Sequence, residues 1–155
     1  MNVDNRVPVY TLQTAAECAR NNRHAAAGTE WLELPAHLHA QPDMFVARVH
    51  GDTMDKRIPP GALCLFRFNP QGARNGKILL VQHPRIPTNE QDAHCVLKRY
   101  KTHKEADNKG HVHTVVLLSP ESRNPAHQTF AMSAEEAEEM LVVAEFMGVV
   151  QAQQV

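Results

Sequence analysis

The sequence has little net charge of either sign. Sixteen Lys and Arg residues stand against seventeen Asp and Glu residues, which gives a formal charge of −1. A protein dedicated to nucleic-acid binding commonly carries a strong basic excess. The composition therefore argues against direct, sequence-specific DNA binding.

Long hydrophobic runs are also missing. No stretch approaches the roughly 18 apolar residues of a membrane-spanning helix. Residues 1–5 lack the basic start and the apolar run of a signal peptide. We therefore expect a cytoplasmic protein without a membrane partner.

Cysteine is scarce, and metal-binding spacings are absent. Cys18, Cys64 and Cys95 are odd in number, widely separated and without a Cys-x-x-Cys pair, which argues against a disulfide framework or a zinc ribbon. His111 and His113 would share one face of a strand, but no third ligand stands at a recognisable spacing. We predict reduced thiols, no metal site and no cofactor.

The composition that is present favours one mainly β domain. The chain has 155 residues, of which 43% are hydrophobic and 21% charged, as in ordinary globular proteins. Ten prolines and seven glycines spread along the chain indicate many turns and short strands. Short apolar runs between turn signatures predict strands at Met44–Val49, Gly61–Phe68, Lys77–Gln82, Cys95–Tyr100 and Val112–Leu118.

A short helix is predicted near the C-terminus. Ser133 with Glu136 three residues later forms a capping-box pattern, which begins a helix over Ala134–Met140. The apolar, β-branched segment Leu141–Val150 then predicts a closing strand.

Residues 1–43 show a weak pattern and are interpreted as an N-terminal arm, with the main domain at 44–155. Val7–Tyr10 reads as a short extended piece, and Thr11–Arg23 is the one plausible helix. A helix-turn-helix needs a recognition helix braced by others, so we do not expect a repressor.

The candidate chemistry is a hydroxyl and a lysine. Thr53 follows a predicted strand in the segment His50-Gly51-Asp52-Thr53-Met54, where an exposed nucleophile can sit and where the backbone N–H groups of Asp52 and Thr53 can hold an oxyanion. Strand alternation places Lys98 on the same face as Val96 and Tyr100. Lowering the pKa of a lysine from ~10.4 to about 7 requires burial beside the hydroxyl.

Four ordered blocks carry a family resemblance. They are Phe45–Met54, Ile58–Gly61, Val96–Tyr100 and Leu118–Pro125. Together they resemble the signature of the LexA/UmuD-like S24 peptidase domain, over about Met44 to Val150. The resemblance implies a LexA/signal-peptidase-like β domain, often a homodimer, that cleaves its own N-terminal linker with a Ser-Lys dyad. It also implies a RecA–single-stranded-DNA filament, or another DNA-repair or phage-defence protein, as partner.

Carried over to this sequence, the resemblance makes Thr53 the nucleophile and Lys98 the general base. The family normally has Ser at this position. Thr adds a methyl group that stiffens χ1 and crowds the path of attack. We therefore expect a Thr-Lys dyad of reduced activity.

The expected cleavage site also departs from the family pattern. Family members cut an Ala-Gly or Cys-Gly bond in the arm, and the corresponding bond here is Ala16–Glu17. Glu17 adds bulk and a charge where the family has glycine. Ala27–Gly28 is the only Ala-Gly pair in the chain and is the competing site.

Three functions follow from these observations. The first is self-processing by an S24-type peptidase in DNA-damage (SOS-type) or phage-defence regulation. The second is a non-catalytic interaction or dimerisation module on the same fold, which the changes at residues 17 and 53 favour. The third, a UmuD-like accessory subunit of a translesion polymerase, rests on size and arm-only architecture.

Overall fold

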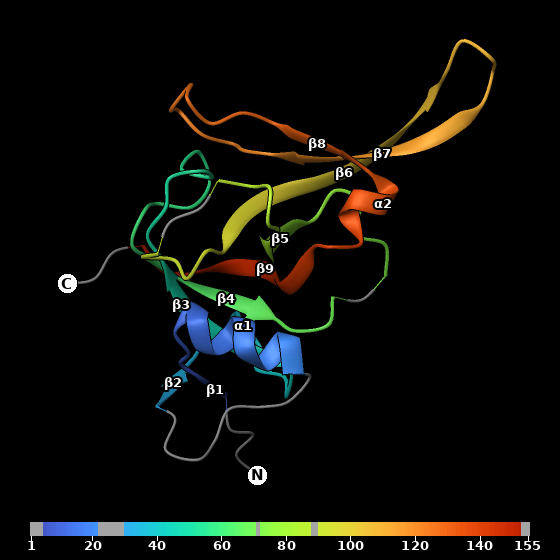
Figure 1. The fold of residues 1–155 in the computed structure, drawn as a ribbon. Coiled ribbons are helices and arrows are strands. Elements are labelled where there is room, and N and C mark those ends of the chain that lie inside the picture. Colours follow the sequence, from blue (N-terminus) through green and yellow to red (C-terminus); the bar gives the residue numbers. More distant parts are fainter. Residues whose placement is uncertain (1–4, 22–29, 71, 88–89, 153–155) are drawn as a thin grey trace.

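Antiparallel strands are the predominant secondary structure, as the sequence predicts. The computed structural model describes residues 5–21, 30–70, 72–87 and 90–152 (Figure 1). The elements are β1 (Arg6–Pro8), α1 (Leu12–Asn21), β2 (Trp31–Glu33), β3 (Met44–Val49), β4 (Ala62–Arg67), β5 (Ile78–Gln82), β6 (Val96–Ala106), β7 (Val112–Ser119), β8 (Phe130–Ser133), α2 (Ala134–Ala137) and β9 (Leu141–Gln151).

The main sheet is a curled antiparallel sheet with the strand order β3-β4-β9-β5-β6-β7-β8. The last strand, β9, therefore lies in the middle, hydrogen-bonded to β4 and β5. β6 pairs with β5 through Val96–Arg99, and with β7 only from Arg99 onward. At the start of β6, these pairings thus cover one edge of the strand.

The two faces of the sheet bury different hydrophobic clusters. One cluster includes Phe45, Phe66, Leu80 and Leu97. The other consists of buried Leu79, Val81, Ile86, Val116, Leu118, Met132 and Met140, against which Val96 and Tyr100 also pack. Side chains alternate along β6, so Leu97 enters the first cluster while its neighbour Val96 faces the second.

The N-terminal region belongs to the packed structure, which differs from the expected arm. The helix α1 packs against β3 and β9, and its Ala15 and Ala16 are 0% and 2% exposed. β1 pairs with β2 in a separate two-stranded sheet, and Val7 lies in a third cluster with residues of β3 and β4. Small alanine side chains let the helix approach the sheet closely, so a weak apolar pattern is enough for packing.

The predicted C-terminal helix is present but shorter. The capping box is confirmed: the Ser133 hydroxyl accepts the Glu136 N–H at 3.1 Å, and the Glu136 carboxylate accepts the Ser133 N–H at 3.3 Å. The helix ends at Ala137, and tighter turns lead to Met140, whose N–H donates to Ala137 O. The chain leaves the helix because Met140 enters the second cluster. The short strands β2 and β8 have no counterpart in the sequence prediction, whereas β1 overlaps the extended piece predicted at Val7–Tyr10.

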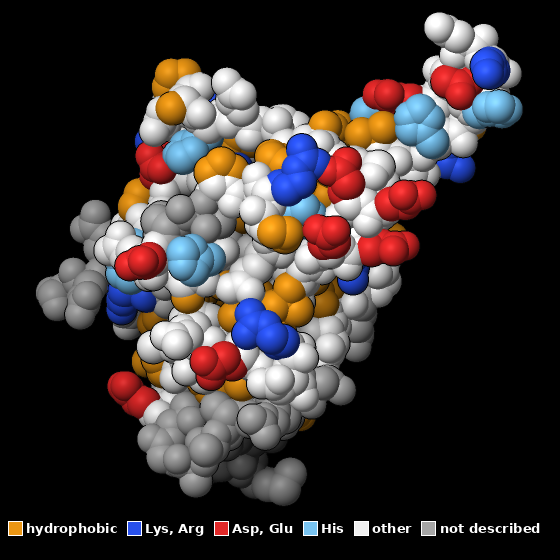
Figure 2. All heavy atoms as spheres, in the orientation of Figure 1, with side chains coloured by type: hydrophobic (Ala, Val, Ile, Leu, Met, Phe, Trp, Pro, Cys, Tyr) orange, Lys and Arg blue, Asp and Glu red, His pale blue; other side chains and the backbone are white. Residues whose placement is uncertain are grey.

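β6 and β7 extend beyond the sheet as a two-stranded ribbon (Figure 1). Charged and histidine side chains gather on this ribbon in the view of Figure 2. β6 continues to Ala106 rather than ending at the predicted Tyr100. In the part of the chain that the structure describes, no helix is long and apolar enough to span a membrane.

Candidate functional site

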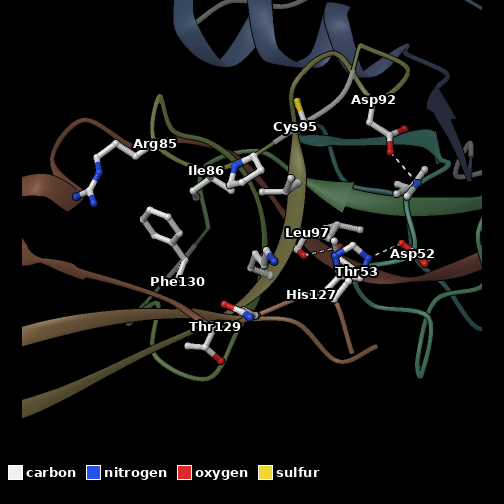
Figure 3. Close-up of a pocket in the computed structure, with 17 residues that line it drawn as sticks. Asp52, Thr53, Arg85, Ile86, Asp92, Cys95, Leu97, His127, Thr129 and Phe130 are labelled. Carbon is white, nitrogen blue, oxygen red and sulfur yellow. Dashed lines mark hydrogen bonds and ion pairs between the residues drawn. The ribbon is translucent and has the colours of Figure 1, made fainter. Parts of the chain in front are cut away.

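A cleft of about 520 Å³ brings the predicted nucleophile and base together. Its walls come from the loop after β3, the segment after β5, the turn before β6 with the start of that strand, and the segment that leads into β8 (Figure 3). The lining residues include Gly51, Asp52, Thr53, Ile86, Pro87, Asp92, Cys95, Val96, Leu97, Lys98, His127, Thr129 and Phe130.

Lys98 is buried in an apolar setting. It stands between Val96 and Tyr100, which pack against the second cluster, and directly opposite the fully buried Leu79 in the β5–β6 register. The residue is 5% exposed, and its amino group has no hydrogen-bond or ion-pair partner among the described residues. Burial lowers the pKa of the Lys98 amino group. The uncharged amine, the form that a general base requires, is therefore easier to reach than in an exposed lysine.

Thr53 occupies the turn after β3, beside the base strand. Its Oγ1 donates a hydrogen bond to the Leu97 carbonyl oxygen at 3.0 Å (Figure 3). Leu97 immediately precedes Lys98 on β6. The Thr53 N–H donates no hydrogen bond to any residue the structure describes. This N–H is therefore available to an oxyanion. The Asp52 backbone N–H, the other predicted donor, hydrogen-bonds to the carboxylate of Asp52 itself.

The segment Leu118–Pro125, the last of the four sequence blocks, holds the nucleophile turn. The Glu121 N–H donates to Thr53 O at 2.9 Å, and Glu121 O accepts the Lys56 N–H at 3.0 Å. The Glu121 carboxylate pairs with Arg57 of the turn at 2.7 Å and with Arg99 of β6 at 2.6 Å. One residue thus connects the nucleophile turn to the strand that carries Lys98.

The Glu121 carboxyl is held ionised. Burial by itself raises its pKa, but the hydrogen bonds and charges of Arg57 and Arg99 outweigh burial and hold the pKa of Glu121 below its ordinary value.

A second carboxylate anchors the same turn from the other side of the cleft. Asp52 Oδ1 lies 2.5 Å from His127 Nε2 (Figure 3). The Asn124 amide donates to Asp52 Oδ2 at 3.4 Å. The hydrogen bond from His127 is the main cause that lowers the pKa of Asp52. Sequence reasoning did not find His127, because no spacing links positions 52 and 127.

Asp92 is a third carboxylate that the sequence did not single out. It is 3% exposed and accepts the backbone N–H groups of His50 at 3.0 Å and Gly51 at 2.7 Å. These are the residues just before Asp52 and Thr53. The loop that presents the nucleophile is therefore tied to the segment leading into β6.

Cys95 is a further nucleophile-type side chain that lines the cleft. Burial raises the pKa of its thiol to about 11, so the thiolate is scarce near neutral pH.

His111 pairs with Asp107 at 3.3 Å, while His113 lies near Glu105. Over the described ranges, no three His, Cys, Asp or Glu side chains are grouped so that they could hold a metal ion.

The structure describes one of the two candidate cleavage bonds and not the other. Ala16–Glu17 lies inside α1, with Ala16 in the core and Glu17 exposed. A helical bond with one side chain buried does not offer the extended backbone that a peptidase cleft takes. Ala27–Gly28 lies outside the described residues.

A scan of the sequence against protein-family models gave no match, and a search of curated proteins also gave none.

Proposed function

We propose that this protein is a self-processing peptidase of the S24 type, in which Thr53 is the nucleophile and Lys98 the general base. The observation that supports the proposal is the burial of Lys98, with a lowered pKa, in the cleft that also contains Thr53. A lysine buried among apolar side chains, without an acidic partner, is unfavourable for stability. Such a lysine beside a hydroxyl fits a base that must be uncharged to act.

The reaction follows from this arrangement. Uncharged Lys98 takes the proton of the Thr53 hydroxyl while Oγ1 bonds to the substrate carbonyl carbon, and the backbone N–H of Thr53 donates to the carbonyl oxygen as it becomes negative. The Lys98 ammonium then gives its proton to the leaving amine as the peptide bond breaks. Water, deprotonated by Lys98, hydrolyses the ester left on Thr53.

Thr53 must change its hydrogen bond before it reacts. Its hydroxyl donates to Leu97 O, so this hydrogen bond has to break before the proton passes to Lys98. A β-branched side chain has few χ1 positions. We therefore expect slow turnover.

We place cleavage at Ala27–Gly28 rather than at Ala16–Glu17. Cutting the latter bond requires α1 to unfold, because Ala16 is buried between the helix and the sheet. Glycine after the scissile bond also lets a bent chain enter a cleft without a side chain. The substrate is this chain or a second copy of it.

The non-catalytic module is the second candidate, and one observation favours it. The Thr53 hydroxyl is engaged by a backbone carbonyl, as a purely structural threonine would be. The homodimer, the RecA filament or another DNA-repair or phage-defence partner, the role as polymerase accessory subunit and the cytoplasmic location stay predictions.

The experiment is intact mass spectrometry of the purified protein over time at pH 7 and at about pH 10, where even an ordinary lysine begins to lose its proton. The peptidase proposal expects a break that is faster at the higher pH, with a new chain starting at Gly28. Lys98→Ala should remove the break. Lys101→Ala, an exposed lysine on the same strand, should leave it unchanged.

An unbroken wild-type chain at both pH values would contradict the peptidase proposal and favour the non-catalytic module. A break that persists in Lys98→Ala would contradict the assignment of Lys98 as the base.

A further inference from the structure

Two backbone N–H groups of the nucleophile loop converge on one buried carboxylate. Asp92 Oδ1 accepts the His50 N–H at 3.0 Å, and Oδ2 accepts the Gly51 N–H at 2.7 Å. Asp92 Oδ1 also lies 3.3 Å from His50 Nδ1. Hydrogen bonds to a charged acceptor are short and strong, and here they fix the two residues that precede Asp52 and Thr53.

The loop and the Asp92 carboxylate approach each other closely at Gly51. A Cβ at Gly51 would lie 3.1 Å from Asp92 Oδ2, closer than an ordinary van der Waals contact. The φ angle at Gly51 is not in the left-handed region. A side chain at position 51 would therefore press on the Asp92 carboxylate and make it shift by a few tenths of an ångström, while the backbone conformation itself does not call for glycine.

The turn that carries Asp92 is held in an unusual conformation. The Cys95 N–H closes the turn on Asp92 O at 2.9 Å. The two residues between them, Ala93 and His94, have φ angles of 53° and 61°. Residues with side chains seldom adopt positive φ, and they persist there only where the surrounding structure fixes them.

This turn leads directly into the strand of the base. Val96 begins β6, and Lys98 follows two residues later. The Asp92 carboxylate therefore joins the backbone before the nucleophile to the backbone before the base. We propose that Asp92 is a positioning residue that sets the place of Thr53 relative to Lys98, an inference that rests on the proposed function of these two residues.

The test uses the full chain with Asp92→Asn and a matched control, Asp107→Asn. Asp107 also accepts two backbone N–H groups, from Lys109 at 2.8 Å and His111 at 2.9 Å, but on the projecting ribbon. The first readout is amide NMR with hydrogen exchange. In Asp92→Asn we expect the His50 and Gly51 amide protons to move upfield and exchange at least tenfold faster, and the Thr53 signals to shift. The control should leave all three residues unchanged.

The second readout is the rate of self-cleavage against pH, measured where each variant is fully folded. Asp92→Asn should lower the plateau rate about tenfold or more and leave the midpoint of the profile unchanged, because burial and not Asp92 lowers the pKa of Lys98. A purely structural role would reduce only the folded fraction and not the rate of folded molecules. If Asp92→Asn does not fold, Gly51→Ala gives a second perturbation of the same contact, with the same expected pattern.

Two results for Asp92→Asn would overturn the proposal. One is that the His50 and Gly51 amides shift and exchange faster while the plateau rate of cleavage stays unchanged. The other is that these two amides do not change at all. A wild-type chain that is never cut would contradict the proposed peptidase function. The NMR spectra would then test separately whether Asp92 positions Thr53. Thr53 signals that shift with the His50 and Gly51 amides would support it, and Thr53 signals that stay in place would overturn it.

Discussion

The Thr53 hydroxyl donates its hydrogen bond to the carbonyl oxygen of Leu97, at 3.0 Å. Leu97 is the residue directly before Lys98, and consecutive residues of a strand point their side chains to opposite faces. Thr53 is thus hydrogen-bonded to the backbone of β6, while the side chain of Lys98, on the same strand, faces the second hydrophobic cluster. This relationship ties the turn that carries Thr53 to the strand that carries Lys98, and both residues line one cleft.

Replacing Thr53 with Ser should accelerate self-cleavage. Serine keeps the hydroxyl and removes the methyl group that restricts χ1, so the Oγ can leave Leu97 O and approach the base more easily. A gain of about 2 kcal/mol in transition-state stabilisation would raise the rate about 30-fold. The rate is measured by intact mass over time, and Thr114→Ser serves as control. A Thr53→Ser chain that is cut no faster than wild type would show that the methyl group is not the obstacle.

Replacing Lys98 with Met should stabilise the fold near neutral pH. Methionine fills similar space without a charge to desolvate, and we expect a gain of about 1 kcal/mol in the free energy of unfolding. The comparison is made by urea unfolding, with the exposed Lys101→Met as the matched control.

The same pair of proteins should differ in pH dependence. The pKa of Lys98 is lower in the folded state than its ordinary 10.5, so between the two values the unfolded chain binds more protons. The stability of wild type should therefore rise with pH across this window, and it should lack this rise below the folded pKa. In Lys98→Met that contribution is absent. Equal slopes for the two proteins would contradict the burial of a titrating Lys98.

Replacing Glu121 with Gln should remove part of the acid sensitivity of the fold. The pKa of Glu121 lies below its ordinary 4.5 in the folded protein, so its contribution is present above 4.5 and is lost as pH falls through the lowered value. We expect a loss of about 1 kcal/mol at pH 7, because the pairs with Arg57 and Arg99 are partly exposed. Urea unfolding at pH 7 and pH 3 measures both effects. The control variant Glu90→Gln, at an exposed position, should have the same free energy of unfolding as wild type at both pH values. If Glu121→Gln also matches wild type, the pairs of Glu121 with Arg57 and Arg99 do not stabilise the fold.

Replacing His94 with Gly should relieve strain in the turn before β6. His94 has a φ angle of 61°, which glycine adopts without steric cost. We expect thermal unfolding to show a gain of about 1 kcal/mol. Asn69→Gly is the comparison, because Asn69 has a φ of 52° and asparagine tolerates this region better, so its gain should be smaller. A destabilised His94→Gly chain would mean that contacts of the imidazole outweigh the strain.

Local patterns account for what could be read from the sequence. The strands β3, β4, β5, β7 and β9 follow from short apolar runs between turn residues, and the start of α2 follows from the Ser133–Glu136 capping box. Helix α1 lies within Thr11–Arg23, the N-terminal segment whose sequence is compatible with a helix. The short strands β2 and β8 gave no signal, because three or four positions cannot show a period.

The candidate site was visible in the sequence only in part. Thr53 and Lys98 were found because each stands in a recognisable local segment, and the two line one cleft. Asp92 and His127 were missed, because each acts through a contact with a residue at least 40 positions away. Such contacts leave no periodic or spacing signal in a single sequence.

The sequence by itself determined the β class, the positions of most strands and the residue types offered for chemistry, because these depend on local propensity and on alternation along the chain. Tertiary structure decided that β9 lies in the middle of the sheet, that α1 buries Ala16, and that Lys98 faces an apolar cluster. It also decided that Asp92 holds the backbone before Thr53. These features depend on which distant segments pack together. Only after that packing is Lys98 buried with a lowered pKa, and only then does Gly51 approach Asp92 closely.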